Sequence, residues 1–274
     1  MTMRSRARAE SLGTIQKPAV LTEWFKLAES LGRLGDDLLA GYDPPLDVEG
    51  KVTAGALFVQ VQKSIRASLV LAERGLPGDA NAVLRSAVES VIALHALEAD
   101  PGFMVRLVGD HFSHHRKQAR AFVRGFGYSQ DLDQADIQRL NRTADGADAE
   151  EHGFYGKVKP IIWADEAKKH CPILYDLVYR PLSTYGTHVS TRRLDEHLKT
   201  DQNGRVVGLN RGPTTEGLNI TLKFACGILL SAARVAANML ERPGFEDRLR
   251  FQTRRFGKLS DQDCGHGTSR DGPQ

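Results

Sequence analysis

Apolar residues recur at steps of three and four over several long segments of the chain, which is the spacing of one face of an α-helix. This pattern predicts a helix over about 19–41, ending near Gly41, and a second over about 48–74, ending before Gly75. The pair Pro44-Pro45 separates the two segments. The apolar stripes are Trp24, Leu27, Leu31, Leu34 and Leu38 in the first helix, and Leu57, Val61, Ile65, Leu69 and Ala72 in the second.

Four further segments are predicted to be helical, over about 78–99, 101–125, 172–185 and 214–241. The helix that begins at Pro172 is expected to bury an apolar stripe of Ile173, Leu174, Leu177, Val178 and Leu182. We therefore predict an all-α fold, an irregular helical bundle of about six to eight helices. Its core is expected to consist of the helices 48–74, 78–99, 101–125 and 214–241.

The remaining segments lack helical periodicity. Residues 1–17 and 258–274 are predicted to be disordered tails of a single helical domain over 18–257. Within that domain we expect a loop insert over 126–157, with a short helix near 131–143, and a loop over 199–213 with a turn at Asn203-Gly204. A short basic amphipathic stretch is predicted near 245–256.

The composition is that of an ordinary globular protein, with 41% hydrophobic and 26% charged residues. A formal net charge of +3 does not indicate a nucleic-acid-binding protein. The apolar window 224–240 is interrupted by Ser231, Arg234 and Asn238 and is shorter than the roughly 20 residues of a membrane span, so we expect a buried core helix. Three cysteines without a CxxC pair and the absence of a signal-peptide pattern predict a cytoplasmic protein.

Two charged residues occur in the middle of the predicted helix 78–99, which is otherwise apolar or small on nearly all sides. A helix of this kind is expected to be buried. Burying a charge without a partner costs on the order of several kcal/mol. Arg85 and Glu89 must therefore be paired or bound. They form either a structural ion pair or the wall of a ligand pocket.

The predicted helix 101–125 carries His111 and His115 within its apolar stripe of Met104, Leu107, Val108, Ala119 and Phe122. Three roles are open for the two histidines: partly buried structural residues, proton transfer or phosphate contact, and metal binding. No further ligand set accompanies the pair, so we predict no metal and no cofactor. Arg106 precedes His111 by five residues, which matches the Arg-x4–6-His spacing of helical toxin nucleases, although such matches also arise by chance.

A third polar group occurs where the predicted helix from Pro172 ends, and consists of Ser183, Tyr185 and His188. Helix ends present polar side chains readily to a cleft. The segment has no GxSxG elbow, so a nucleophilic serine is not indicated.

These motifs resemble a widespread bacterial family of helical proteins, the domain of unknown function numbered fifty-six seventy-seven. The resemblance is carried by Arg85-Ser-Ala-Val-Glu89, by Asp100-Pro101 leading to His111, and by Ser183-Thr-Tyr185-Gly-Thr-His188. It covers roughly residues 50–240 and implies a helical fold, but no reaction.

The polar residues on apolar faces are expected to converge in one pocket between helices, so that Arg85, Glu89, His111, His115, Tyr185 and His188 bind a ligand. On this basis we predict a binding or regulatory protein for a small-molecule or nucleotide ligand, without an assignable reaction, that forms a homo-oligomer. The alternative is an RNA- or phosphodiester-cleaving hydrolase of the bacterial toxin or defence type. In that enzyme His111 or His188 would transfer protons, and Arg85 or Arg106 would stabilise phosphoryl charge.

Overall fold

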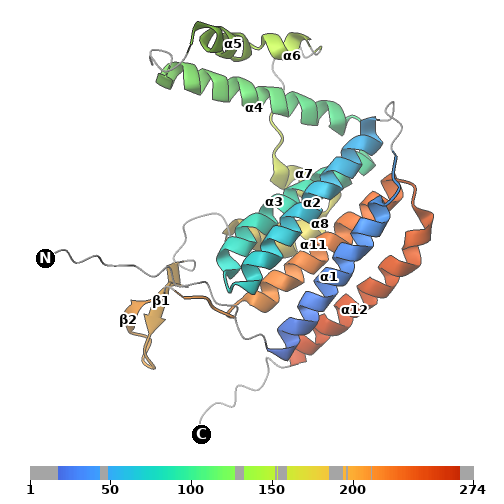
Figure 1. The fold of residues 1–274 in the computed structure, drawn as a ribbon, viewed down its shortest axis with the longest axis vertical. Helices are drawn as coiled ribbons and strands as arrows, with labels where there is room; N and C mark the ends of the chain where they lie inside the picture. The colour runs from blue at the N-terminus through green and yellow to red at the C-terminus, as the bar shows by residue number, and fades with distance from the viewer. Residues whose placement is uncertain are drawn as a thin grey trace, which may run out of the picture. The chain divides into compact units, whose positions relative to one another are not determined.

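The computed structural model describes residues 18–43, 49–126, 133–151, 153, 159–184, 194–195, 197–210 and 212–265. These residues are predominantly helical, with one two-stranded antiparallel sheet (Figure 1). Within them, eight helices have eight residues or more, namely α1 to α5, α7, α11 and α12, which confirms the all-α class. Their contacts divide into two compact units, Met1–His95 with Cys171–Gln274, and Ala96–His170. The single domain over 18–257 stays a prediction.

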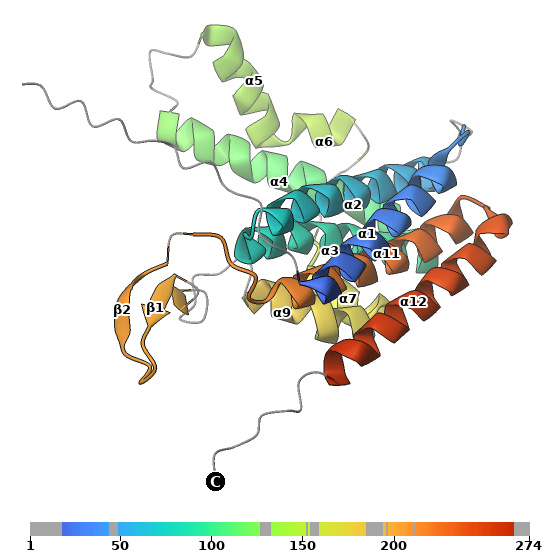
Figure 2. The same ribbon diagram turned by 60° about the horizontal axis from the view of Figure 1, so that its bottom comes forward.

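The first unit is built on five long helices, whose bounds agree with the predicted segments at most ends. They are α1 (Ala19–Leu39), α2 (Glu49–Glu73), α3 (Pro77–Ala99), α11 (Leu218–Met239) and α12 (Glu246–Gly265), with α3 continuing into the second unit after His95. Figures 1 and 2 show α1, α2, α11 and α12 side by side, and α11 contacts each of the other three. Although α11 is long and apolar enough to cross a membrane, 61% of its apolar window is buried within the protein. It is the core helix that the sequence predicted.

Helix α1 buries its predicted stripe completely, with Trp24, Leu27 and Leu31 each 0% exposed. Full burial of side chains of this size stabilises by about 1.5–3 kcal/mol each. The indole N–H of Trp24 donates to the carboxylate of Asp263 at 3.0 Å, and the indole ring contacts Phe256 edge-on at 5.5 Å. Helix α12 therefore extends well beyond the short amphipathic stretch predicted near 245–256. The prediction of a disordered tail was wrong for residues 258–265, because these contacts hold them against α1.

The stretch from Pro172 is helical, as predicted, but it changes its type along its length. The α-helix α8 (Pro172–Leu174) leads into the π-helix η1 (Tyr175–Tyr179) and then α9 (Arg180–Leu182). Leu174 and Leu182 are buried, whereas Ile173 and Leu177 are 74% and 64% exposed, so the predicted stripe was wrong at these two positions. The wider i→i+5 turn of the π-helix departs from the 3.6-residue period on which that stripe was drawn.

The predicted loop over 199–213 contains a β-hairpin, formed by β1 (Leu198–Thr200) and β2 (Val206–Leu209). Leu198 pairs with Leu209 and Thr200 with Val206, with a bulge between them. The predicted turn is present: Gly204 has φ +75°, and the Asp201 carboxylate accepts hydrogen bonds from the backbone N–H groups of Asn203 and Arg205, both at 2.9 Å. The prediction missed the strands because they are short.

The second unit consists of α4 (Phe103–Phe126), α5 (Gln134–Asp145), α6 (Ala147–Glu151) and α7 (Trp163–His170). Helix α5 packs on α4 and confirms the short helix predicted near 131–143, whereas α6 replaces part of the expected loop. The α5 C-terminus is capped by Gly146 at φ +93°, and Arg116 and Arg120 of α4 donate to the carbonyl of Ala144. A one-turn connector, η3 (Pro243–Phe245), precedes α12 in the first unit.

Candidate functional site

The polar pair of α3 lies in a helix that is otherwise enclosed. Leu84, Val88 and Val91 are 0% exposed, whereas the side chains of Arg85 and Glu89 are 27% and 28% exposed. The apolar faces are buried as predicted, and the charged side is partly open to water. A partly exposed pair within a buried helix is accessible to a ligand without being fully solvated.

Arg85 is fixed by three side chains. Its Nε donates to Ser183 Oγ at 3.1 Å, and its Nη2 donates to Tyr179 Oη at 3.0 Å and lies 3.2 Å from Glu89 Oε1. The guanidinium carbon also lies 5.3 Å from the centre of the Tyr179 ring, and that ring stacks on Tyr175 at 5.9 Å. We call Arg85, Glu89, Tyr179 and Ser183 the α3 polar cluster. It joins α3 to the helical stretch that begins at Pro172.

In the α3 polar cluster, burial and the charge of Arg85 act on Glu89 in opposite directions. Burial raises the pKa of Glu89 above its ordinary value, and the charge of Arg85 opposes this increase only in part. The carboxyl group of Glu89 therefore holds a proton more readily than an exposed glutamate does. Tyr179, which contacts Arg85 through both its hydroxyl and its ring, was not among the predicted site residues.

The histidine of α3 has a structural partner. His95 Nε2 lies 2.9 Å from the Ser231 hydroxyl of α11, so it links two core helices. This contact accounts for a polar residue on the apolar face of α3.

Two predicted site residues, Tyr185 and His188, lie outside the described residues. His111 and His115 lie in the second unit, so the predicted convergence of all six residues in one pocket would join the two units. That convergence stays a prediction.

Both His111 and His115 are exposed on α4, with ring centres 4.1 Å apart. The interpretation of this pair as partly buried structural residues was therefore wrong. Phe122, assigned to the same apolar stripe, is 50% exposed. Among the described residues, no group of three or more His, Cys, Asp or Glu side chains could hold a metal ion.

Arg106, the predicted stabiliser of phosphoryl charge, is held by acidic side chains of its own unit. Its Nη2 lies 3.3 Å from Asp100 Oδ2 and 3.3 Å from Glu166 Oε2, and its Nη1 also binds Glu166. The hydrogen bond to Glu166 raises the pKa of Arg106 above its ordinary value. The side chain of Glu166 is only 11% exposed, so this ion pair links α7 to α4 at a partly buried position.

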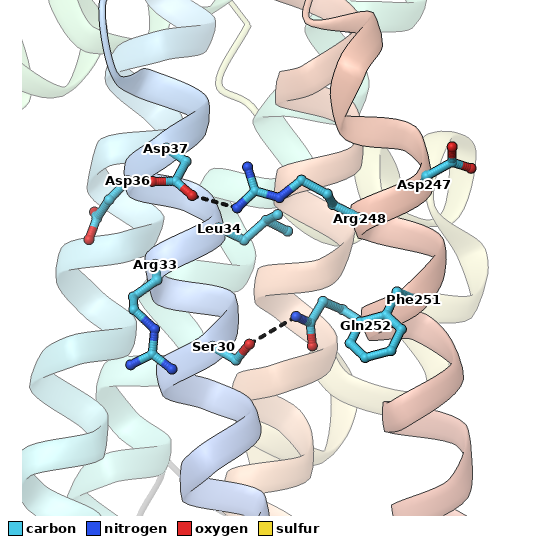
Figure 3. A pocket seen from close by; sticks show the side chains of 9 residues that line it. All are labelled: Ser30, Arg33, Leu34, Asp36, Asp37, Asp247, Arg248, Phe251 and Gln252. Carbon is cyan, nitrogen blue, oxygen red and sulfur yellow. Dashed lines mark hydrogen bonds and ion pairs between the residues drawn. The ribbon is translucent and has the colours of Figure 1, made fainter.

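A hollow of 560 Å³ lies between α1 and α12 in the first unit (Figure 3). Two contacts cross it: Arg248 binds Asp37, and Gln252 Nε2 donates to Ser30 Oγ at 2.8 Å. The side chain of Arg33 lies at one end of the hollow, on α1. Because these contacts join the helices, we interpret this hollow as a packing junction.

Comparison with known proteins gives a single result. No curated protein and no solved structure matches the chain. The sequence model of a family of unknown function, DUF5677, matches residues 51–205. This range is shorter than the resemblance predicted over roughly 50–240, since it ends before α11, but it includes the whole α3 polar cluster. The chain belongs to the family of unknown function DUF5677.

Proposed function

We propose that the protein is a non-enzymatic binding protein with a regulatory role, and that the α3 polar cluster is its ligand site. One observation carries this proposal: the guanidinium of Arg85 is held by three side chains while a quarter of its side chain stays exposed. A group that is already oriented loses less conformational entropy when it binds a ligand. This arrangement favours recognition over a purely structural ion pair.

The contacts of Arg85 indicate the chemistry of the ligand. Among the described residues, its partners engage Nε and Nη2, which leaves the donors of Nη1 for a ligand acceptor. The neighbouring carboxyl group of Glu89 can accept a hydrogen bond or, when protonated, donate one. We therefore expect a small polar ligand that presents an acceptor and a donor side by side, such as an amide or a nucleobase edge.

Thermal-shift measurements with amino-acid amides, nucleobases and nucleosides test the proposal. A ligand at 100 times its dissociation constant stabilises the folded protein by about 2.7 kcal/mol, which a melting experiment resolves. We expect one of these classes to raise the melting temperature of the wild type but not of Arg85→Lys, in which the guanidinium fork is lost. Tyr179→Phe, which keeps the ring, should reduce the shift.

The matched control is Arg180→Lys on α9, where the arginine is exposed and 3.3 Å from Asp176. It should respond to the ligand as the wild type does. An equal shift in Arg85→Lys, or no shift with any compound, contradicts the proposal.

The second candidate is the RNA- or phosphodiester-cleaving hydrolase. The exposure and close approach of His111 and His115 favour it, because both rings can reach a substrate. It has less support, since Arg106 is engaged by Glu166 and Asp100. Cleavage of mixed RNA that is lost in His111→Ala would establish it in place of the binding protein.

We also propose that the protein is bacterial and cytoplasmic and forms a homo-oligomer. The burial of two free thiols, Cys171 and Cys226, is compatible with a reducing compartment. Light scattering on the purified protein tests the oligomer, and a monomeric mass contradicts it.

A further inference from the structure

A second hollow of the first unit lies between the C-terminal part of α11 and the N-terminal part of α12, and has a volume of 720 Å³. None of its residues belongs to the α3 polar cluster, and all follow the segment matched by the family. We call it the α11–α12 groove. Its lining includes Arg234, Asn238, Glu241, Arg242, Glu246, Leu249, Arg250 and Arg254.

The charge of the groove is unbalanced. Four guanidinium groups line it against two carboxylates, and one carboxylate, that of Glu241, pairs with Lys51 at 2.7 Å. Arg250 is 3.7 Å from Asp247, in a highly exposed pair of the kind that contributes little. Within the described part of the chain, Arg234 and Arg254 form no ion pair. The groove therefore attracts anions.

The other two arginines of α12 differ in how their charge is met. Arg248 binds the carboxylate of Asp37, whereas Arg255 donates to the neutral amide oxygen of Gln252 at 3.2 Å and so keeps its charge. Arg255 does not line the groove. Four arginines that line a single hollow suit a compact anion better than a nucleic-acid strand, which needs a longer track of charges.

Arg242 is placed in the groove wall by the end of α11. Glu241 has φ +52°, and the backbone N–H of Arg242 returns to the carbonyl of Ala237 at 2.8 Å, so the chain reverses there. Nη2 of Arg242 is anchored on the carbonyl of Ala40 at 2.5 Å. Its Nε is buried and has no hydrogen-bond partner among the described residues. Within the described part of the chain no carboxylate pairs with Arg242, so its charge remains available to the groove.

We propose that the α11–α12 groove binds a small phosphate-bearing ligand of the nucleotide class. Guanidinium groups match phosphate oxygens in paired hydrogen bonds, and several of them converge here. The volume lies within the range of small-molecule sites. Ala237, Pro243 and Leu249 provide an apolar wall for the rest of the ligand. The proposal is independent of the function assigned to the α3 polar cluster.

Calorimetric titration with ATP, ADP and AMP at physiological salt tests this site. Affinity should fall as phosphates are removed, from ATP to ADP to AMP. The double variant Arg234→Gln/Arg254→Gln should bind ATP at least about tenfold more weakly. Glu246→Gln removes a carboxylate that repels the phosphates of ATP. This variant should bind ATP roughly several-fold more tightly, because one like-charge contact is lost. Because the two variants change affinity in opposite directions, partial unfolding cannot produce the same result.

Arg33→Gln, which removes an exposed arginine from the hollow between α1 and α12, is the matched control and should leave ATP binding unchanged. Equal binding by wild type and the double variant overturns the proposal, as does the absence of binding at about 1 mM ATP. Binding of a single-stranded oligonucleotide but not of ATP also overturns it, in favour of a polymer ligand. Inorganic pyrophosphate that binds as tightly as ATP would refute the role of the apolar wall and with it the nucleotide class.

Discussion

Substitutions of the two charged residues of α3 should change the free energy of unfolding in different ways, which tests how the α3 polar cluster is stabilised. In Arg85→Met, the hydroxyls of Tyr179 and Ser183 lose their donor and Glu89 loses its counter-charge. Breaking a fully buried pair in this way costs about 3–5 kcal/mol. Since both side chains are slightly more than a quarter exposed, we expect a loss of about 2–3 kcal/mol in the free energy of unfolding.

Glu89→Gln should behave differently. Burial raises the pKa of Glu89 more than Arg85 lowers it, so ionised Glu89 costs more free energy than its attraction to Arg85 returns. Glutamine removes the charge but keeps an oxygen that can accept from Arg85. We therefore expect Glu89→Gln to be equal in stability to the wild type or more stable by up to about 1 kcal/mol at neutral pH.

The pH dependence of stability tests whether the ionisation of Glu89 causes the expected difference between Glu89→Gln and the wild type. A carboxyl group whose pKa is higher in the folded than in the unfolded protein binds more protons when folded. Its contribution to stability is therefore fully present below its ordinary pKa of 4.5 and is lost as the pH rises through the folded value. The stability difference between Glu89→Gln and the wild type should accordingly shrink on acidification, as the wild-type carboxyl becomes neutral.

Urea denaturation followed by circular dichroism at pH about 7 and about 5 measures both effects. Glu29→Gln is the control, because its carboxylate is 62% exposed and 4.0 Å from Arg33, and it should change stability by less than about 0.5 kcal/mol. A loss of more than about 1.5 kcal/mol in Glu89→Gln at neutral pH would refute the reasoning, since the pair would then be net stabilising.

Two further predictions concern the first unit. Deleting residues 258–274 removes Asp263 and leaves the buried indole N–H of Trp24 without its acceptor. The free energy of unfolding, measured by urea denaturation, should fall by about 1–3 kcal/mol. Deleting only residues 266–274 keeps that contact and is the control. The buried thiols of Cys171 and Cys226 should resist iodoacetamide in the native protein, because burial raises the pKa of Cys171 to about 11 and also raises the pKa of Cys226. Peptide mapping at mildly alkaline pH should find both cysteines unmodified until denaturant is added. Rapid modification of the native protein would contradict their burial.

The sequence was sufficient to predict the helices whose burial follows a regular period. Trp24 and Leu31 mark the buried face of α1 because an α-helix returns to the same face every three or four residues. The same argument identified Arg85 and Glu89 as polar residues in apolar surroundings. It could not identify Tyr179, which is 94 residues from Arg85 and becomes its partner only through packing.

Where the local geometry departs from the α-helix, periodicity misleads. Leu177 was assigned to a buried stripe and is exposed, because it lies within the π-helix. The length of α12 was underestimated for a different reason. Asp263 and Trp24 are 239 residues apart, and a charged, glycine-containing C-terminus gives no local sign that its helix is held by a distant indole.

The π-helix Tyr175–Tyr179 has a consequence for chain length in this region. A helix with i→i+5 bonds accommodates one residue more in a turn than an α-helix does, and here the backbone N–H of Arg180 returns to the carbonyl of Tyr175. Removing one residue between them would turn this bond into the i→i+4 bond of an α-helix, so the wider turn absorbs one residue without redirecting the chain that follows. Ser183 would then keep its place beside Arg85 Nε. A protein that shares this helix but is one residue shorter there is therefore expected to retain the bond between serine and arginine, with a regular α-helix in place of the π-helix.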